Sequence, residues 1–277
     1  MLQSDIAGRT LRVLAVYLAL TAIPVMRAGM MGATSSGLVV AALHTTMLAA
    51  IIALVVMGRA ADLVAWLPLA LWPALYAEVP TVIAGLGGSF HDATVQGWER
   101  AIFGGQPAFT LAGAIPSRAL SELLHLGYLS YYPLIYLPPI LLFVRGRRAE
   151  FAQTVFALTC VWVACLVAFA VFPVEGPRYQ WSPPAELGPI RMLVLVLLES
   201  GSARGTAFPS SHVAVAVVQT MAALRYQPRV GAIASVATVL LACGAVYGGF
   251  HYAVDVIAGA ALGLFVGRMT VSRPASQ

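Results

Sequence analysis

The sequence contains no lysine and few charged residues of any kind. Charged side chains make up 10% of the 277 residues, against roughly 25% in an ordinary soluble domain. Hydrophobic residues make up 60% of the chain. This composition excludes a soluble globular protein. It predicts an all-α membrane protein, a polytopic helix bundle that is embedded in the bilayer.

Cysteine is scarce as well. Cys160, Cys165 and Cys243 all lie in apolar stretches, and no Cys-x-x-Cys pair occurs. Cysteines in such a context are expected to be small buried hydrophobic residues and not to form a disulfide frame or a metal site. The net charge of +5 is not accompanied by a basic run with interleaved aromatic residues. We therefore expect no cofactor, no metal and no nucleic-acid partner, and the pattern gives no oligomeric state.

Long apolar runs predict the membrane spans, because a span needs about 20 mostly apolar residues. By this measure we place eight spans near residues 11–31, 37–57, 63–86, 128–144, 151–172, 211–225, 229–248 and 252–270, of which the fourth and the sixth are short. We assign residues 1–60 to N-terminal transmembrane helices. Residues 61–277 are assigned to a core of six membrane helices.

The arginines predict the orientation of these spans. With a cytoplasmic N-terminus, ten arginines fall on the inner side: Arg9, Arg12, Arg59, Arg145, Arg147, Arg148, Arg225, Arg229, Arg268 and Arg273. Six fall on the outer side: Arg27, Arg100, Arg118, Arg178, Arg191 and Arg204. Five of those six lie in long loops, where arginines have little influence on the orientation of the spans. We therefore expect both termini in the cytoplasm. Residues 87–127 and 173–210 then lie outside the cytoplasm.

Two short polar segments interrupt this apolar background, and one of them contains His251 and Asp255. Residues four apart at the start of a helix share a face. A carboxylate that accepts a hydrogen bond from one imidazole nitrogen fixes the tautomer and leaves the other nitrogen free as a nucleophile. The alternative is a polar helix end, with Asp255 favoured by the helix dipole.

The other polar segment is Phe208-Pro209-Ser210-Ser211-His212. A serine before an apolar run is a helix N-cap signal. Free amide groups at such a helix start bind anions, and His212 would lie beside that anion, placed to protonate a leaving oxygen. Alternatively, Ser210 only caps the helix. On the expected topology, His212 and His251 both lie at the outer face of the membrane.

Arginine supplies the third element of this chemistry. Arg178 offers a planar guanidinium that suits phosphate oxygens, although an ordinary interfacial arginine would also lie there. Arg204 is a second candidate ligand with weaker support. Together with the two histidines, these residues indicate phosphoryl transfer.

Other polar residues are given structural interpretations. We expect His44 and His125 to be packed or headgroup-facing, His91-Asp92 to lie on a loop surface, and Glu78 to pair with an arginine or line a headgroup cavity. Aromatic residues near span ends are interpreted as interfacial anchors: Trp66, Trp98, Tyr128, Tyr131 and Trp181.

The order Arg178, then Pro-Ser-x-His, then His-x-x-x-Asp resembles the type 2 phosphatidic acid phosphatase superfamily. Within it, His-Tyr-x-x-Asp-Val and Gly-Pro-Arg are similar to the branch that contains inositol phosphorylceramide synthase. The resemblance also takes in Glu99 and residues 128–132, and covers most of the chain from about residue 60 onward.

The resemblance implies a role for each residue. His251 attacks phosphorus and carries a phosphohistidine, and Asp255 orients it. His212 is the acid for the leaving group and then the base for water or an alcohol. Arg178 holds the phosphoryl oxygens together with Ser210 and Ser211. Arg204 is our own hypothesis for a replacement of a phosphate-binding arginine that the superfamily has and this sequence lacks. No metal is required.

The sequence also departs from the superfamily. The usual lysine of the first motif is missing, and Gly244 and Ala245 occupy the places of the usual Ser-Arg before the final histidine. The expected function is a lipid phosphatase or phosphotransferase that acts on lipid phosphate esters. A transporter or flippase with a buried His/Asp proton relay is the alternative. A serine protease using Ser211 lacks the Gly-x-Ser-x-Gly turn.

Overall fold

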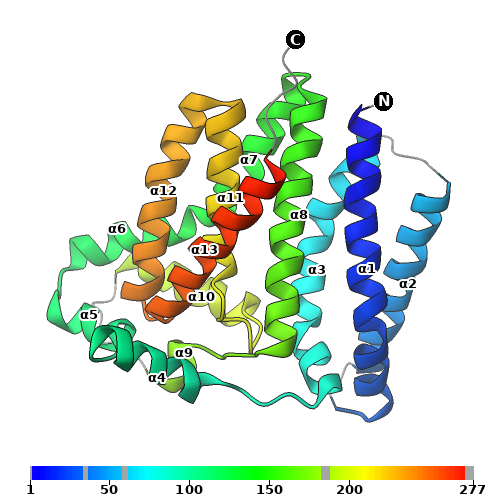
Figure 1. The fold of residues 1–277 in the computed structure, drawn as a ribbon. Coiled ribbons are helices and arrows are strands. Elements are labelled where there is room, and N and C mark those ends of the chain that lie inside the picture. The colour runs from blue at the N-terminus through cyan, green and yellow to red at the C-terminus, as the bar shows by residue number, and fades with distance from the viewer. Residues whose placement is uncertain (1, 34–36, 58–61, 182–187, 272–277) are drawn as a thin grey trace.

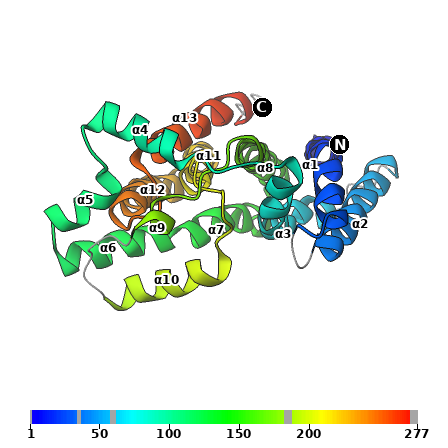
Figure 2. The same ribbon diagram turned by 90° about the horizontal axis from the view of Figure 1, so that it is seen from below.

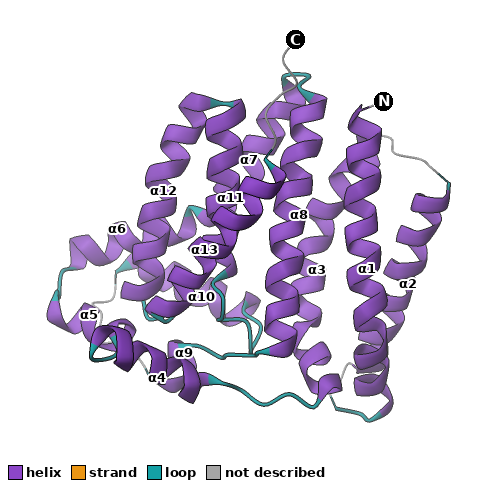
Figure 3. Cartoon of the chain, viewed as in Figure 1, coloured by secondary structure: helices purple, strands orange, loops and turns teal. Residues whose placement is uncertain are grey.

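The chain forms a bundle of helices, described here from a computed structural model of residues 2–33, 37–57, 62–181 and 188–271 (Figure 1). In these ranges every regular element is helical, apart from one isolated bridge between Val174 and Thr206 (Figure 3). The helices are α1 (Leu2–Met30), α2 (Gly37–Val56), α3 (Asp62–Leu86), α4 (Asp92–Phe103), α5 (Pro107–Ala114), α6 (Arg118–Leu129), α7 (Tyr131–Val144), α8 (Arg148–Val171), α9 (Pro177–Gln180), α10 (Pro189–Gly201), α11 (Ser211–Tyr226), α12 (Pro228–Tyr247) and α13 (Ala253–Thr270).

The predicted all-α membrane bundle is confirmed, but with fewer spans than the eight expected. Among the described residues, six helices are long and apolar enough to cross a bilayer: α1, α2, α3, α8, α12 and α13. The number rises to seven if α6 and α7, which meet at a bend of 41°, form one broken span. With that pair counted, the expected span that is missing is α11, whose 16 residues fall short of the length of about 20 that a span needs. Without it, the expected span at residues 128–144 is missing as well, because α7 has only 14 residues.

The upright helices surround α8, which packs against α1, α3, α7, α11 and α13. Most of its side chains are buried, which fits a largely apolar helix, whereas Val167 and Val171 near its end are exposed. The helices α4, α5, α6, α9 and α10 lie at one end of the bundle, across the upright helices (Figures 1 and 2). The chain begins at the opposite end. The cysteines are free, and Cys243 is exposed, contrary to the expectation that all three are buried.

Glycines bring the last helix close to α11. A Cβ atom at Gly259 would lie 2.4 Å from the carbonyl oxygen of Ser210, and one at Gly263 would lie 2.6 Å from that of Ala214. Small residues four apart permit such close packing of membrane helices. The start of α13 is therefore held against the start of α11, which places the two polar segments side by side.

A buried pair ties the first helices to the bundle. His44 of α2 has its Nδ1 atom 2.9 Å from Glu78 Oε2 on α3 and its Nε2 atom 2.9 Å from the carbonyl oxygen of Leu18 on α1. Glu78 thus pairs with a histidine and not with an arginine, and it does not line the cavity described below. The division at residue 60 stays a prediction. Arg59 and Arg273, two of the arginines counted for orientation, lie outside the described residues.

Candidate active site

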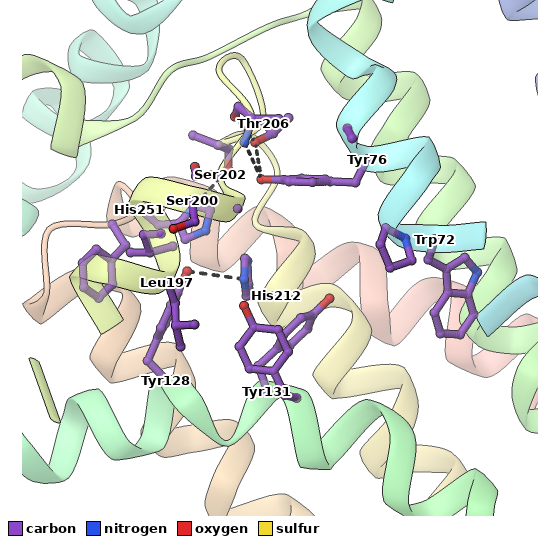
Figure 4. A pocket seen from close by; sticks show the side chains of 18 of the residues that line it. Trp72, Tyr76, Tyr128, Tyr131, Leu197, Ser200, Ser202, Thr206, His212 and His251 are labelled. Atoms are coloured by element: carbon purple, nitrogen blue, oxygen red, sulfur yellow. Dashed lines mark hydrogen bonds between the residues drawn. The ribbon is translucent and has the colours of Figure 1, made fainter. Parts of the chain in front are cut away.

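A cavity of about 540 Å³ lies at the end of the bundle where α11 and α13 begin and α8 and α12 end. Figure 4 shows His212 and His251 on one side of it, with Tyr76 and Trp72 of α3 across from them. The cavity continues from the histidines to Trp72 and Trp162. Its lining combines aromatic rings with a small polar set at one end: Glu175, Arg178, Ser200, Ser202, Thr206, His212 and His251.

His251 is held by local backbone geometry at the end of α12. After α12 ends, the amide groups of Phe250 and His251 both donate to the carbonyl oxygen of Ala245, each at 3.0 Å. The Nδ1 atom of His251 then lies 3.1 Å from the carbonyl oxygen of Ala207 and 3.5 Å from Asp255 Oδ2. Both neighbours are acceptors, so Nδ1 carries the hydrogen and Nε2 keeps its lone pair.

Asp255 caps the start of α13 in addition to lying near His251, as its spacing predicted. It is fully buried in the first turn of α13, and its Oδ2 accepts from the amide of Tyr252 at 2.8 Å. This bond is part of a capping box that starts the helix. The closest partner of the His251 Nδ1 atom is the carbonyl oxygen of Ala207 and not Asp255. The tautomer is therefore fixed by two acceptors together.

His212 lies across from His251, in the first turn of α11. The centroids of the two imidazole rings are 5.7 Å apart, with an angle of 61° between their planes. The His212 ring is packed between Tyr128, at 5.1 Å, and Tyr131, at 4.3 Å between centroids. The hydroxyl of Tyr128 lies 3.4 Å from His212 Nε2. Two imidazoles thus face one space in which a tetrahedral anion would fit.

Arg178 reaches the same cavity from the short helix α9. Its guanidinium donates to the carbonyl oxygen of Leu198 at 3.3 Å and lies over the ring of Tyr179. Gly176, with a φ of +94°, leads into this helix, and a Cβ atom there would meet Ala207 at 3.0 Å. A backbone bond from Ala207 N to the carbonyl oxygen of Val174, at 2.8 Å, joins this segment to the one that precedes His212.

The structure does not bring the other predicted phosphate ligands to the cavity. Arg204 is 61% exposed, pairs with Glu175 and is not among the described residues that line the cavity. Ser210 and Ser211 are buried and also lie off its surface. The predicted N-cap is confirmed, because Ser210 Oγ accepts from the amide of Val213. Phosphate binding by these three residues stays a prediction.

Packing explains why this chain lacks the superfamily's usual Ser-Arg pair at positions 244 and 245. Ala245 is fully buried. A Cβ atom at Gly244 would lie 2.2 Å from the carbonyl oxygen of Leu124 on α6. An arginine at either position would collide with neighbouring backbone or core. Among the described residues that line the cavity, Arg178 is thus the one guanidinium.

Three residues that were given structural interpretations lie at or beside the site. Asp92 is buried, 6% exposed, and not on a loop surface, because it accepts from the amides of Glu175 and Gly176. Tyr128 and Tyr131 are also buried and line the cavity, so they are not interfacial anchors. Their partners lie far away along the chain, and no local pattern indicates them.

Glu99, noted only as part of the resemblance, is fully buried and accepts from the amides of Ala253 and Val254. Burial raises the pKa of Glu99 above its usual range, and these two hydrogen bonds oppose the rise. The side chains of His125 and Arg191 are likewise buried, and Arg191 Nη1 lies 3.1 Å from His125 Nε2. His125 is packed, as expected.

This arrangement has the parts for phosphoryl transfer. An imidazole whose Nδ1 atom faces two acceptors, a second imidazole across from it and a guanidinium all line one cavity. A nucleophile, an acid-base group and a charge-stabilising group are what such a reaction needs. No cluster of three or more histidine, cysteine or carboxylate side chains that would suit a metal occurs in the described part of the chain.

Comparison with known proteins places these features in context. The sequence model of the PAP2 superfamily matches residues 93–267. A PA-phosphatase related-family protein of Dictyostelium discoideum is 22% identical over 237 residues, which are 70% of this chain and 42% of that protein. The chain thus spans less than half the length of this curated relative. A transmembrane PAP2 type phosphatidylglycerolphosphate phosphatase from Bacillus subtilis is 20% identical, with a TM-score of 0.42, over 72% of this chain and 94% of that one.

Proposed function

The chain belongs to the PAP2 superfamily, and on this premise we propose that it is an integral-membrane phosphatase or phosphotransferase of lipid phosphate esters. The observation that carries the proposal is the meeting of His212, His251 and Arg178 in one cavity. The cavity lies at the end of a multi-pass bundle, within reach of a headgroup whose chains stay in the bilayer.

The chemistry proceeds in two steps. His251 Nε2 attacks phosphorus, and the bond from phosphorus to the lipid oxygen breaks as His212 donates a proton to that oxygen. Water or an alcohol then attacks the phosphohistidine while His212 takes its proton, and the phosphorus–nitrogen bond breaks. Arg178 stabilises the charge on the phosphoryl oxygens in both steps, and Asp255 with the Ala207 carbonyl holds the His251 tautomer.

Water and alcohol share the first step, so hydrolysis and headgroup transfer are two outcomes of one site. The phosphatase outcome is supported by the names of the relatives above. The transferase outcome, similar to inositol phosphorylceramide synthase, is supported by His251-Tyr252-x-x-Asp255-Val256 and Gly176-Pro177-Arg178. Substrate and acceptor are therefore questions for the same assay.

The assay uses purified protein with phosphatidic acid labelled in its phosphate, with and without ceramide or a diacylglycerol whose acyl chains differ from those of the substrate. Release of free phosphate supports the phosphatase, and label in a new lipid supports the transferase. If neither product forms and the protein instead transports a lipid or an ion across vesicle membranes, the alternative of a transporter with a His/Asp proton relay is favoured. His251→Ala is the control that ties any product to the site.

We also propose that the cavity faces away from the cytoplasm. The described arginines that were assigned to the inner side lie on helices and turns at or toward the bundle end opposite the cavity: Arg9, Arg12, Arg145, Arg147, Arg148, Arg225, Arg229 and Arg268. Arginine-rich ends stay in the cytoplasm. In a variant whose three native cysteines are replaced by alanine, a cysteine placed at the exposed Thr94 should react with an impermeant maleimide in intact cells. Reaction only after lysis would reverse the orientation.

A further inference from the structure

The amphipathic helix α4 crosses the cavity end of the bundle and turns polar side chains inward. Asp92, Gln96 and Glu99 occupy one face of it, because residues four and seven apart lie about one and two turns along a helix. Asp92 is 6% exposed and Glu99 is 0% exposed. Carboxylates are rarely buried in this way unless they are paired or hydrogen-bonded. Both of their partners are backbone segments of the candidate active site.

Asp92 holds the segment that leads to Arg178. Its Oδ1 atom accepts from the amide of Gly176 at 2.9 Å, and its Oδ2 atom accepts from the amide of Glu175 at 3.0 Å. The hydroxyl of Tyr252 also donates to Oδ1, at 3.1 Å. Both carboxylate oxygens are therefore in use. The bonds fix the backbone two residues before Arg178.

Glu99 holds the segment that follows His251. Its Oε1 atom accepts from the amides of Ala253, at 2.6 Å, and Val254, at 3.2 Å. These are the first amides of α13, which lack partners within the helix. A single oxygen of Glu99 makes both bonds, and its Oε2 atom is buried without a hydrogen-bond partner.

The same helix makes one further link between the two segments. Gln96 Nε2 donates to the hydroxyl of Tyr252 at 3.0 Å, and that hydroxyl donates to Asp92. Tyr252 directly follows His251 in the chain. Residues of α4 thus contact the backbone or side chains on both the Arg178 side and the His251 side of the cavity.

We propose that Asp92 and Glu99 are positioning residues, and that α4 sets the distance between the guanidinium of Arg178 and the attacking imidazole of His251. This rests on the proposed function of the site. Neither carboxylate lines the cavity, so neither contacts the phosphoryl group. A displacement of about 1 Å in a reacting group is enough to lower a rate by about 100-fold.

The two carboxylates differ in a way that conservative variants expose. Glu99→Gln keeps an Oε1 atom that can accept from both Ala253 and Val254, so we expect a kcat like that of the wild type. Asp92→Asn replaces one of two accepting oxygens with an amide that can only donate. It therefore loses the bond from Glu175 or the bonds from Gly176 and Tyr252.

The experiment measures kcat and KM for para-nitrophenyl phosphate, a soluble probe that needs no lipid binding. We expect Asp92→Ala, Asp92→Asn and Glu99→Ala to lower kcat by about 10- to 100-fold, and Glu99→Gln to leave it unchanged. The control is Thr94→Ala, an exposed position on the same helix. Melting temperatures in detergent, measured alongside, identify any variant that is lost through unfolding.

The outcomes separate cleanly. Wild-type kcat in the folded alanine variants would overturn the proposal, and so would equal effects of Glu99→Gln and Asp92→Asn. If the alanine variants do not fold, the comparison of Gln with Asn decides alone. The proposed function fails separately, when His251→Ala keeps its turnover whatever the α4 variants do.

Discussion

The imidazoles of His212 and His251 face each other with their ring centroids 5.7 Å apart, although His212 lies in the first turn of α11 and His251 in the turn between α12 and α13. Glycines at positions 259 and 263 allow α13 to approach α11 closely enough for this meeting. The Nδ1 atom of His251 is occupied by two acceptors. In the proposed mechanism the Nε2 atom of His251, on the other side of the ring from these acceptors, is the nucleophile, and His212 carries the proton.

The division of labour between these histidines predicts a dependence on the leaving group. His251→Ala should abolish turnover of every phosphate ester, because no nucleophile remains. His212→Ala should lose about 10²- to 10⁴-fold with an alkyl phosphate and much less with a nitrophenyl phosphate, whose leaving oxygen needs no proton. Values of kcat/KM for both esters measure this, because kcat/KM reports the steps up to departure of the leaving group and not the later hydrolysis of the intermediate that both esters share. A loss in His212→Ala that is equal for the two esters would contradict the assignment.

Arg178 and Arg204 should differ in their effects on turnover. Arg178 lines the cavity, whereas Arg204 is mostly exposed and pairs with Glu175. We expect Arg178→Ala to lower kcat/KM for a soluble phosphate by about 100-fold or more. Arg204→Ala should change it only slightly, because its partner is a carboxylate at the cavity edge. A large loss in Arg204→Ala would instead support the predicted replacement of the missing arginine.

The buried pair of His44 and Glu78 should matter for stability and not for chemistry. Neither residue lines the cavity. His44→Leu leaves a buried carboxylate without its partner, and we expect a loss of about 3–5 kcal/mol in the free energy of unfolding. The double variant His44→Leu with Glu78→Leu should be less destabilised than His44→Leu. Denaturation in detergent tests this, and additive losses would show that the two side chains do not interact.

Glu99 should make the stability of the protein depend on pH. Burial raises its pKa in the folded state above the usual value of 4.5, although two backbone amides oppose the rise. The folded state then binds this proton more tightly than the unfolded state, so the free energy of unfolding falls as pH rises through the folded pKa. Glu99→Gln has no titrating group at this position and therefore lacks this pH-dependent contribution to the free energy of unfolding. We expect the melting temperature of the variant, measured relative to that of the wild type, to increase as pH rises. A difference that stays constant across pH would contradict this prediction.

The sequence predicts local features of this molecule better than long-range ones. The cap of Ser210, the proximity of His251 and Asp255 and the positions of the long apolar helices follow from neighbours in the chain. Asp92 and Tyr128 were misinterpreted because their partners, Gly176 and His212, come from distant segments. The count of spans failed at α11, because the apolar run at residues 211–225 located this helix correctly but its 16 residues are too few for a span.

Trapping of the phosphoenzyme tests the central claim most directly. His212→Ala lacks the base that activates water, so with a nitrophenyl phosphate labelled at phosphorus the intermediate should accumulate. Rapid quenching and peptide mapping should then find an acid-labile, base-stable label on His251. Absence of any label under turnover, or a label on Ser211 or another side chain, would contradict the account.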